Sequence, residues 1–406
     1  MSVAGGTAVL KFGGTSVADA EHRALAFERI AASREAGHDT VAVVSAMGRP
    51  PDPYATDALL GLIDGASGTY NADILLSTGE LIAAAVFAHE LEATGIPALA
   101  LTGAQAGIVT DGRHGDATVL RVDPGPIRAL LERGIVPVVA GFQGATAQGV
   151  TTTLGRGGTD LSAIAIGHAL GAVRTDIYTD VSGAMTADPR RIDGAHTIER
   201  ASLDEMTELA EQGAKVMHRK AAEFARRTGT PYAIKGLRSD RGTLVDETED
   251  RERPVTGVTA SGRVTWIRAI RGDIEDARAR MQLELEMFRR VASDGISIDQ
   301  VTINQAGVCF VVEGDCGNRV RALLGDLNLA VRVRESCSKL SVVGSGMRYA
   351  PGVVFRIVGA LSRANVEIIH CTDSNITISV LVPQDDALRA EQAVHDEFHL
   401  EERMAK

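Results

Sequence analysis

The 406-residue chain is poor in aromatic residues and in cysteine. Aromatic side chains make up 4% of the sequence, with a single tryptophan. All four cysteines lie beyond residue 300 and no two have Cys-x-x-Cys spacing, which argues against a zinc framework and a disulfide scaffold. A His-Glu-x-x-His zinc motif and a Walker P-loop are also absent from the sequence. These absences leave a chain whose function must be sought in other motifs.

Positive charge and long apolar runs are scarce as well. There are 42 Lys and Arg residues against 53 Asp and Glu, a net charge of −11. This balance disfavours an extended nucleic-acid surface, which depends on Lys and Arg contacts to phosphates, but it leaves room for a small basic pocket. No basic leader with an apolar core opens the chain, and no run approaches the roughly 20 apolar residues that span a bilayer. We therefore expect a cytoplasmic protein with neither nucleic acid nor a membrane as its partner.

What the chain does contain is a regular alternation of short β-branched runs with longer helical patterns. Such apolar runs between helices are typical of buried parallel strands. The runs fall at 7–11, 40–44, 97–101, 135–140 and 243–245. Together they predict one α/β domain over residues 1–246.

A charged stretch follows, and the pattern then changes. Residues 247–259 read as a linker because 247–254 are densely charged and have no apolar period. Beyond them, two strand–helix–strand–strand–helix patterns predict a duplicated α+β module, at 260–335 and 336–406. In the first, we expect an amphipathic helix at 281–292. Its buried face is predicted to hold Leu285, Phe288, Val291 and Ala292.

Three clusters of glycine and charged residues stand at the ends of predicted strands, at 11–16, 154–160 and 178–190. Each has an ordinary interpretation: a strand–helix turn, a helix cap and a surface loop. Taken together they indicate a ligand site, because ligands of open α/β sheets bind at the carboxyl ends of the strands. Glycines let backbone amides approach phosphates, and Lys11 and Arg156 add positive charge. These are the requirements of phosphoryl transfer.

The motifs also resemble those of a known family. They are KFGGTS (11–16), VSAMG (44–48), LLSTGE (75–80), LTGAQAG (101–107), AGFQG (140–144), GRGGTD (155–160), TADPR (186–190) and GAKV (213–216). In this order and spacing they resemble the aspartate kinases of the amino-acid kinase superfamily, and residues 52–57 resemble the single-chain monofunctional class. The resemblance implies a three-layer αβα sandwich kinase domain followed by two ferredoxin-like α+β ACT modules.

The resemblance also assigns roles in catalysis and substrate binding. It implies that Lys11 contacts the transferring phosphate, that Asp160 orients Lys11, and that Lys215 reaches the phosphates. Glu80 is implied to face the ammonium group of aspartate, and Arg156 to clamp the α-carboxylate. The aspartate site implied in this way comprises Thr56, Glu80, Arg156, Gly157, Gly158 and Thr159.

The implied nucleotide site comprises Lys11, Phe12, Gly13, Gly14, Ser45, Thr179, Asp180, Met185, Asp188, Arg190 and Lys215. No residue is implied to ligate a metal, since Mg²⁺ would be held largely by ATP oxygens and water. The implied effector residues are Asn304 in the first ACT module and Met347, Pro351, Gly352, Val353, Asp373, Ser374 and Asn375 in the second.

Several positions depart from the family pattern. Leu161 replaces a hydroxyl residue after the paired glycines, Arg219 stands where proline is usual, and residues 234–237 replace a Val-Arg-Ser-Ser sequence. These departures bear on substrate preference and rate more than on fold. They also leave open the alternative that the protein is a specialised paralogue in a secondary pathway.

The resemblance implies an ATP- and Mg²⁺-dependent aspartate kinase of lysine, threonine and methionine biosynthesis. Its effector is implied to be lysine, threonine or diaminopimelate, and its ACT modules to assemble a homodimer or a larger homo-oligomer. Two alternatives stay open: a catalytically weak paralogue that regulates a partner, and a kinase of another acid such as glutamate or N-acetylglutamate. A further alternative is that the ACT modules only dimerise.

Overall fold

The computed structural model of the protein describes residues 5–214, 216–271, 276–314, 316–327 and 329–401. The chain forms two compact units. The first comprises the chain up to Met185 together with Thr197–Asp250, and the second comprises Thr186–His196 together with the chain from Arg251 onward. The first unit therefore leaves out a short internal segment, which packs with the second unit.

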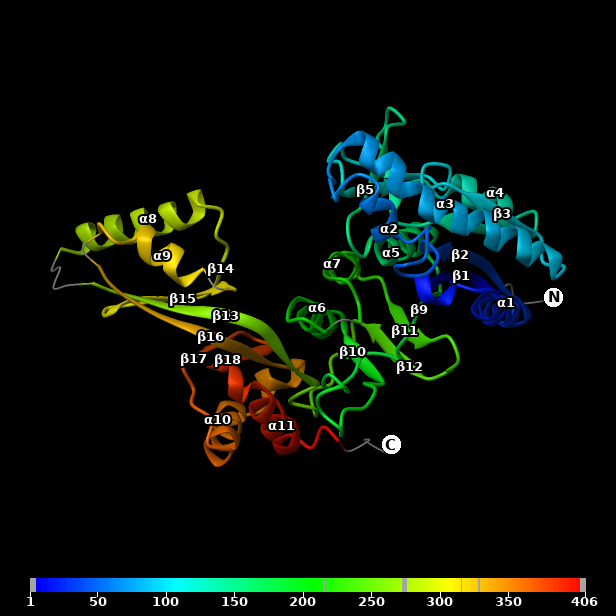
Figure 1. Ribbon diagram of the computed structural model, residues 1–406. Coiled ribbons are helices and arrows are strands. Elements are labelled where there is room, and N and C mark those ends of the chain that lie inside the picture. Colours follow the sequence, from blue (N-terminus) through cyan, green and yellow to red (C-terminus); the bar gives the residue numbers. More distant parts are fainter. Residues whose placement is uncertain (1–4, 215, 272–275, 315, 328, 402–406) are drawn as a thin grey trace. The chain divides into compact units, whose positions relative to one another are not determined.

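An eight-stranded sheet forms the centre of the first unit (Figure 1). Its order is β10-β12-β11-β9-β1-β2-β6-β3, and its paired strands run parallel except for β11 and β12. The strands are β1 (Gly5–Phe12), β2 (His38–Val44), β3 (Ala98–Leu101), β6 (Val136–Ala140), β9 (Arg174–Thr179), β10 (Arg200–Ser202), β11 (Tyr232–Gly236) and β12 (Gly242–Asp246). The predicted runs therefore correspond to β1, β2, β3, β6 and β12, whereas β9, β10 and β11 were not among them.

Helices cover both faces of this sheet. The helices of this unit are α1 (Ala20–Glu35), α2 (Thr56–Gly61), α3 (Tyr70–Ala93), α4 (Gly125–Leu131), α5 (Gly158–Leu170), α6 (Leu203–Glu211) and α7 (Arg219–Thr228). Of these, α2 packs on α3, and α7 on α5 and α6. Leu10 and Phe12 of β1 share a buried core with α1 and α3. Helix α5 packs on β1, β2 and β9. It lies on the opposite face of the sheet, to which the residues between Leu10 and Phe12 and on either side of them point. The three-layer αβα arrangement is thus confirmed.

A second, four-stranded sheet of order β5-β4-β7-β8 was not predicted from the sequence. Its strands are β4 (Ile108–Thr110), β5 (Val119–Val122), β7 (Gln143–Ala145) and β8 (Thr151–Thr153). Strands of three or four residues are too short to show a clear alternation of apolar and polar residues. Their hydrophobic pattern therefore gave no signal.

Among the described residues, α3 is long and apolar enough to cross a membrane by length and composition alone. Half of its most apolar window is buried within the protein. Its buried positions include Asp73 and Glu80, and it packs on β3 and β6. A core helix of a globular domain has these properties.

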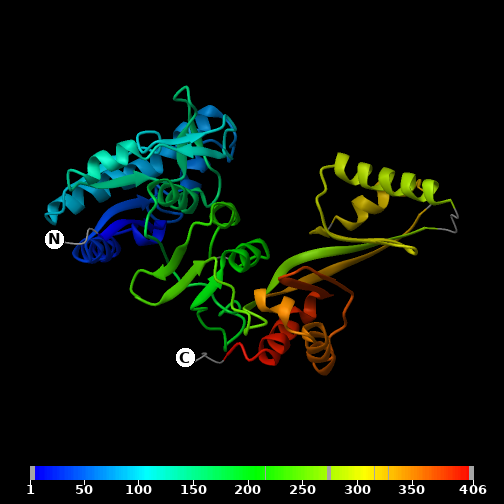
Figure 2. The ribbon, with the colours of Figure 1, turned by 180° about the vertical axis from the view of Figure 1, so that it is seen from behind.

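The second unit is built on one six-stranded sheet of order β14-β15-β13-β16-β18-β17. In both views α8 and α9 cover one end of it and α10 and α11 the other (Figures 1 and 2). Its elements are β13 (Gly257–Arg271), α8 (Ala277–Ser293), β14 (Ile298–Asn304), β15 (Gly307–Glu313), α9 (Gly317–Leu323), β16 (Leu329–Val343), α10 (Val353–Arg363), β17 (His370–Asp373), β18 (Thr377–Pro383) and α11 (Ala387–Glu397).

The two modules are not simply consecutive, as the sequence division at residues 335 and 336 assumed. The core of the second module contains Val255 and Val258 together with Leu340 and Val380. The reason is that the first half of the long strand β13 pairs with the last half of β16, so chain on both sides of the first module completes the second. Residues 257–259 of the expected linker accordingly belong to β13.

The amphipathic interpretation of residues 281–292 was wrong at two positions. Met287 and Val291 are the buried residues of α8, and Phe288 packs against the same core. Leu285 is 70% exposed and Ala292 is also exposed. The helix was predicted correctly, but its buried face was not. Which face is buried depends on the elements that pack against the helix, and these cannot be read from the sequence.

Candidate active site

Lys11 and Asp160, which lie far apart in the sequence, meet at one end of the central sheet. Because Leu10 and Phe12 face α1 and α3, the intervening Lys11 points to the opposite face, where α5 lies. Its Nζ is 2.7 Å from Oδ1 of Asp160, in the first turn of α5, and both side chains are largely buried. An ion pair so shielded from water fixes the position of the ammonium group.

The glycines after β1 bring the backbone close to the loop after β2. A Cβ on Gly14 would lie 2.8 Å from the carbonyl oxygen of Ala46, so no larger residue fits there. A Cβ on Gly13 would lie 3.4 Å from Nζ of Lys11. The Gly13 N–H already donates to the carbonyl of Tyr178 at 3.3 Å, and the Ser45 N–H to that of Phe12 at 3.1 Å. In this state these two amides are therefore engaged within the protein.

Glu80 presents a buried carboxylate beside the same loop. It lies on α3, is 2% exposed, and its Oε1 accepts a hydrogen bond from the Ala46 N–H at 3.2 Å. Its Oε2 is buried and has no hydrogen-bond partner in the part of the chain that the structure describes. Burial raises the pKa of Glu80 to about 8. A buried carboxylate with an unpaired oxygen is suited to a cationic ligand group, whose arrival would restore the charged form.

Thr56 is the first residue of α2, and its segment lies close to α3, the helix that bears Glu80. Gly79 of α3 makes this approach possible, because a Cβ there would lie 2.9 Å from the carbonyl of Tyr54 and 3.1 Å from a methyl group of Leu59. The sequence-predicted Thr56 is half-buried. Its segment is therefore held against the turn of α3 that bears Glu80.

The raised pKa of Glu80 predicts a pH dependence of stability. Between its ordinary value of 4.5 and about 8, the folded protein holds a proton that the unfolded chain has released. The free energy of unfolding should therefore fall as pH rises through this window and level off above it. Glu80→Gln should flatten that part of the profile, as measured by urea unfolding of the ligand-free protein from pH 5 to 8.5. A profile with the same slope in wild type and variant would contradict a neutral Glu80.

Arg156 lies in the loop before α5 and is exposed. Within the part of the chain that the structure describes, it forms no ion pair. Gly157 follows in the left-handed conformation with φ of 73°, and Gly158 and Thr159 open α5 as buried residues. The guanidinium is thus available to an anion at the N-terminal end of α5.

His218 is a residue of this region whose place the sequence reasoning missed. A Cβ on Gly157 would lie 2.1 Å from that of His218, so the two residues are in close contact. Burial lowers the pKa of His218, while Asp160 acts in the opposite direction. Its Nδ1 is buried, and no described residue forms a hydrogen bond with it. The only sequence signal was its position after the GAKV motif.

The residues predicted to bind the nucleotide are divided between the two units. Thr179 ends β9, and its hydroxyl donates to the Asp180 carboxylate at 3.1 Å. Arg49, which sequence reasoning did not single out, donates to the same carboxylate at 2.9 Å. Met185 belongs to the first unit, whereas Asp188 and Arg190 belong to the segment that packs with the second. Lys215 lies outside the described residues.

The departures from the family pattern have structural roles. Leu161 is buried in α5. Arg219 is the first residue of α7 and forms an exposed pair with Glu223, at a position where a missing proline costs little. Lys235 pairs with the buried Asp176 at 3.1 Å between β11 and β9. The change at residues 234–237 thus acts first on packing of the sheet.

Most of the predicted effector residues gather at one end of the second module. Met347 and Val353 are buried, and Gly352 before α10 has φ of 89°. Asp373, Ser374 and Asn375 form the exposed β17–β18 turn. That turn lies beside the start of the Met347 segment, because the Gly344 N–H donates to the carbonyl of Ile376 at 2.9 Å. Pro351 is exposed within the same segment.

The effector residue predicted in the first module, Asn304, forms a local hydrogen bond. Asn304, at the end of β14, is exposed and accepts a hydrogen bond from the Ala306 N–H at 2.9 Å. The amide side chain therefore stabilises the hairpin between β14 and β15 in this state.

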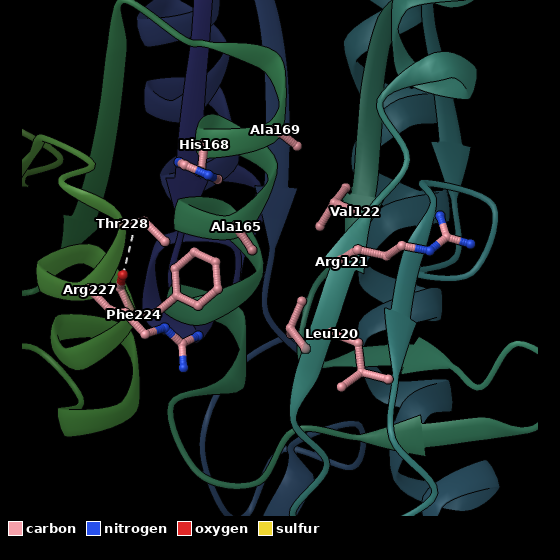
Figure 3. Close-up of a pocket in the computed structure, with 10 residues that line it drawn as sticks. Leu120, Arg121, Val122, Ala165, His168, Ala169, Phe224, Arg227 and Thr228 are labelled. Atoms are coloured by element: carbon pink, nitrogen blue, oxygen red, sulfur yellow. Dashed lines mark hydrogen bonds between the residues drawn. The ribbon is translucent and has the colours of Figure 1, made fainter.

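One hollow of the first unit is away from these residues. It has a volume of about 400 Å³ and lies between β5, α5 and α7 (Figure 3). Phe224 of α7 faces it, and the guanidinium of Arg121 points away from it. None of the residues predicted to act in catalysis lines it. The candidate active site is therefore the Lys11–Asp160 region and not this hollow.

Comparisons with known proteins find matches for both parts of the chain. A model of the amino acid kinase family matches residues 6–236, and a model of the ACT domain matches residues 340–398. Aspartokinase 1 of Bacillus subtilis is 40% identical over 403 residues, covering 97% of this chain and 98% of that protein. The aspartokinase of Geobacillus stearothermophilus is 36% identical over 412 residues, covering 98% and 99%.

A solved structure shares both units. E. coli aspartokinase III in complex with aspartate and ADP, in the R-state, superposes with a TM-score of 0.74 at 25% identity. The match covers 96% of this chain and 99% of that one. The same enzyme in complex with lysine and aspartate, in the T-state, gives a TM-score of 0.72.

Proposed function

This chain belongs to the aspartokinases of the amino acid kinase family, and from this membership we propose how its residues transfer a phosphoryl group from ATP to aspartate. The product is 4-phospho-L-aspartate. The observation that carries the proposal is the shielded ion pair between Lys11 and Asp160 at 2.7 Å. It is joined by the buried Oε2 of Glu80, for which the described residues offer no hydrogen-bond partner. Lys11 supplies a fixed cation for the phosphates of ATP, and Glu80 supplies an anion for the amino group of aspartate.

Aspartate is held by its two ends in this proposal. The ammonium group pairs with Glu80, whose Oε2 has no hydrogen-bond partner among the described residues. The α-carboxylate pairs with Arg156, whose planar guanidinium can donate two parallel hydrogen bonds. Thr56 and Thr159 contribute polar contacts, with Gly157 and Gly158 giving the backbone room to approach. The β-carboxylate is then left free to react.

The transfer needs no general base, because the β-carboxylate is already ionised at pH 7. One of its oxygens attacks the γ-phosphorus and the bond to the β,γ-bridging oxygen breaks, releasing ADP. Lys11 stabilises the negative charge on the transferring group, and Asp160 keeps its ammonium in place. Phe12, Gly13, Gly14, Ser45, Thr179, Asp180, Met185, Asp188, Arg190 and Lys215 complete the proposed nucleotide site.

Magnesium is proposed to arrive with ATP. The donors present fit that arrangement, since Asp160 is paired with Lys11 and Asp180 with Arg49, which leaves neither carboxylate free to build a cage of oxygens. When bound, the ion neutralises phosphate charge and is coordinated largely by ATP oxygens and water.

We propose further that the protein serves lysine, threonine and methionine biosynthesis in the cytoplasm, as a homodimer or larger homo-oligomer joined through its ACT modules. The lysine complex of the E. coli enzyme supports an amino acid effector. Candidates are lysine, threonine and diaminopimelate. The proposed effector residues are Met347, Pro351, Gly352, Val353, Asp373, Ser374 and Asn375 of the second module, with Asn304 of the first.

The test is a hydroxamate assay of the full chain with aspartate, ATP and Mg²⁺, repeated with lysine, threonine and diaminopimelate singly and in pairs. We expect product with aspartate and at least fivefold inhibition by one effector or pair, the range of an allosteric coupling of about 1–3 kcal/mol. If the protein phosphorylated glutamate or N-acetylglutamate instead of aspartate, the proposed substrate would be wrong. Activity that no effector changes would contradict the regulatory role of the ACT modules.

A further inference from the structure

Asp73 is a fully buried carboxylate that the proposed transfer does not use. It lies in the first turn of α3 and is 0% exposed. Glu80 follows seven residues later, which is two helical turns, so the two carboxylates lie on the same buried face of α3. Glu80 keeps one oxygen without a described partner, whereas both oxygens of Asp73 are engaged within the first unit.

The partners of Asp73 come from two other segments. Its Oδ1 accepts hydrogen bonds from the Gly115 N–H at 3.0 Å and from the Thr153 hydroxyl at 2.5 Å. Its Oδ2 lies 2.6 Å from Nδ1 of His114. Gly115 and His114 belong to the loop between β4 and β5, residues 111–118, and Thr153 is the last residue of β8. One side chain therefore ties α3 to this loop and to the end of β8.

Both segments hold the stretch that carries Arg156. Thr153 is separated from Arg156 by two residues. A Cβ on the second of these, Gly155, would lie 2.6 Å from Oδ1 of Asp116 and 3.2 Å from the carbonyl oxygen of Gly115. The 111–118 loop thus lies directly against the residue before Arg156.

Helix α7 fastens the loop to the same stretch from a third direction. The Lys220 ammonium donates to the carbonyl of Leu154 at 3.2 Å and pairs with the Asp116 carboxylate. The loop and the stretch before Arg156 are therefore held together. Asp73 is the side chain that joins them to the helix that bears Glu80.

Stability alone does not account for a carboxylate at this place. Burying a charged group costs free energy that a neutral residue would not cost. What a carboxylate provides is acceptor capacity, because its two oxygens can take several donors at once. Asp73 uses that capacity to fix three segments relative to one another.

We infer that Asp73 is a positioning residue for the substrate: by tying α3 to the stretch that carries Arg156, it sets the separation between Glu80 and Arg156. That separation then matches the two charged ends of aspartate. The inference rests on the proposed function, which assigns the ammonium group to Glu80 and the α-carboxylate to Arg156. Asp73 acts through these two residues.

The first experiment removes one hydrogen bond to Asp73 and compares it with a neighbouring one. Thr153→Val should raise the KM for aspartate about fivefold and leave the KM for ATP within about twofold of wild type. Thr153→Ser keeps the hydroxyl and should restore the aspartate KM. The matched control is Thr152→Val, which removes a buried hydroxyl from the adjacent residue of β8, 2.6 Å from that of Thr110. It should lower the melting temperature as Thr153→Val does, with both KM values within about twofold of wild type.

The second experiment changes Asp73 itself, alone and together with Arg156→Ala. Asp73→Asn keeps the shape of the side chain, but its amide nitrogen cannot accept a hydrogen bond. We expect it to lower kcat/KM for aspartate about tenfold in the wild-type background and less than twofold in the Arg156→Ala background. The reason is that a substrate held at one end does not sense the separation of two binding groups. Additive losses in the double variant would overturn the inference.

The outcomes also separate this inference from the proposed function. Folded Thr153→Val and Asp73→Asn proteins with the wild-type KM for aspartate would overturn the inference, even where Arg156→Ala shows a carboxylate clamp. Equal rises in the KM values for aspartate and ATP, or a Thr152→Val protein with the same rise, would overturn it as well, because a general structural effect produces them. An unchanged aspartate KM in Arg156→Ala alone would instead overturn the proposed role of Arg156. Should Asp73→Asn fail to fold, the three threonine variants decide.

Discussion

Lys11→Ala is expected to lower kcat about a thousandfold while the protein stays folded, because it removes the cation that the structure fixes at the end of β1. Its Nζ is buried and 2.7 Å from the Asp160 carboxylate, so it is held in one position before any ligand binds. A preorganised charge of this kind stabilises the transferring phosphoryl group without reorganisation. The measurement is kcat in the hydroxamate assay with saturating aspartate and ATP.

Two further variants show whether the loss comes from position as well as charge. Asp160→Asn keeps the shape of the side chain and removes the ion pair, so kcat should fall less than in Lys11→Ala. Lys235→Ala removes another lysine of the same sheet, which is paired with Asp176 at 3.1 Å. This variant should lower the melting temperature and have little effect on kcat. A Lys11→Ala enzyme within tenfold of wild-type kcat would rule out the role proposed for this lysine.

Arg156→Ala is expected to raise the KM for aspartate about a hundredfold and to leave the KM for ATP within about twofold of wild type. The two hydrogen bonds of a guanidinium to a carboxylate are charge-assisted, and their loss costs about 3 kcal/mol, equivalent to about a hundredfold. The exposed Arg156 forms no ion pair in the described part of the chain. Its removal therefore leaves no described carboxylate unpaired, and the protein should stay folded.

Initial rates over a matrix of aspartate and ATP concentrations give both KM values. Arg238→Ala is the control, since it removes an exposed arginine of the same unit that pairs with Glu21. Equal increases in the two KM values for Arg156→Ala would contradict the carboxylate clamp. A hundredfold loss in kcat at unchanged aspartate KM would place Arg156 on the transferring phosphate instead.

Much of the kinase fold could be predicted because its signals are local. The run 135–140 is apolar throughout and the run 7–11 is apolar at its centre, 8–10, as is typical of strands buried on both faces. These runs became β6 and β1. The short strands of the second sheet carry no such signal. Leu285 on α8 was misplaced because a period shows where stripes lie, whereas the neighbouring elements decide which stripe is covered.

The candidate site could be predicted in composition better than in geometry. The glycine clusters stood out because turns at the ends of strands require glycine, as the close approach of Gly14 to Ala46 illustrates. Arg49 and His218 escaped notice because their roles depend on contacts with Asp180 and Gly157, which are remote in the sequence. Glu80 was assigned by resemblance, and its raised pKa follows from burial that only the fold produces.

The sequence by itself determined the family, the parallel strands and the residue types of the site, because motifs, hydrophobic periods and turn residues are properties of neighbouring positions. Only the tertiary structure decided that Lys11 meets Asp160, that β13 serves both modules, and that residues 186–196 pack with α11. These outcomes join segments distant in the chain. They are fixed by which surfaces bury one another most favourably, a property of the whole fold and not of any stretch of sequence.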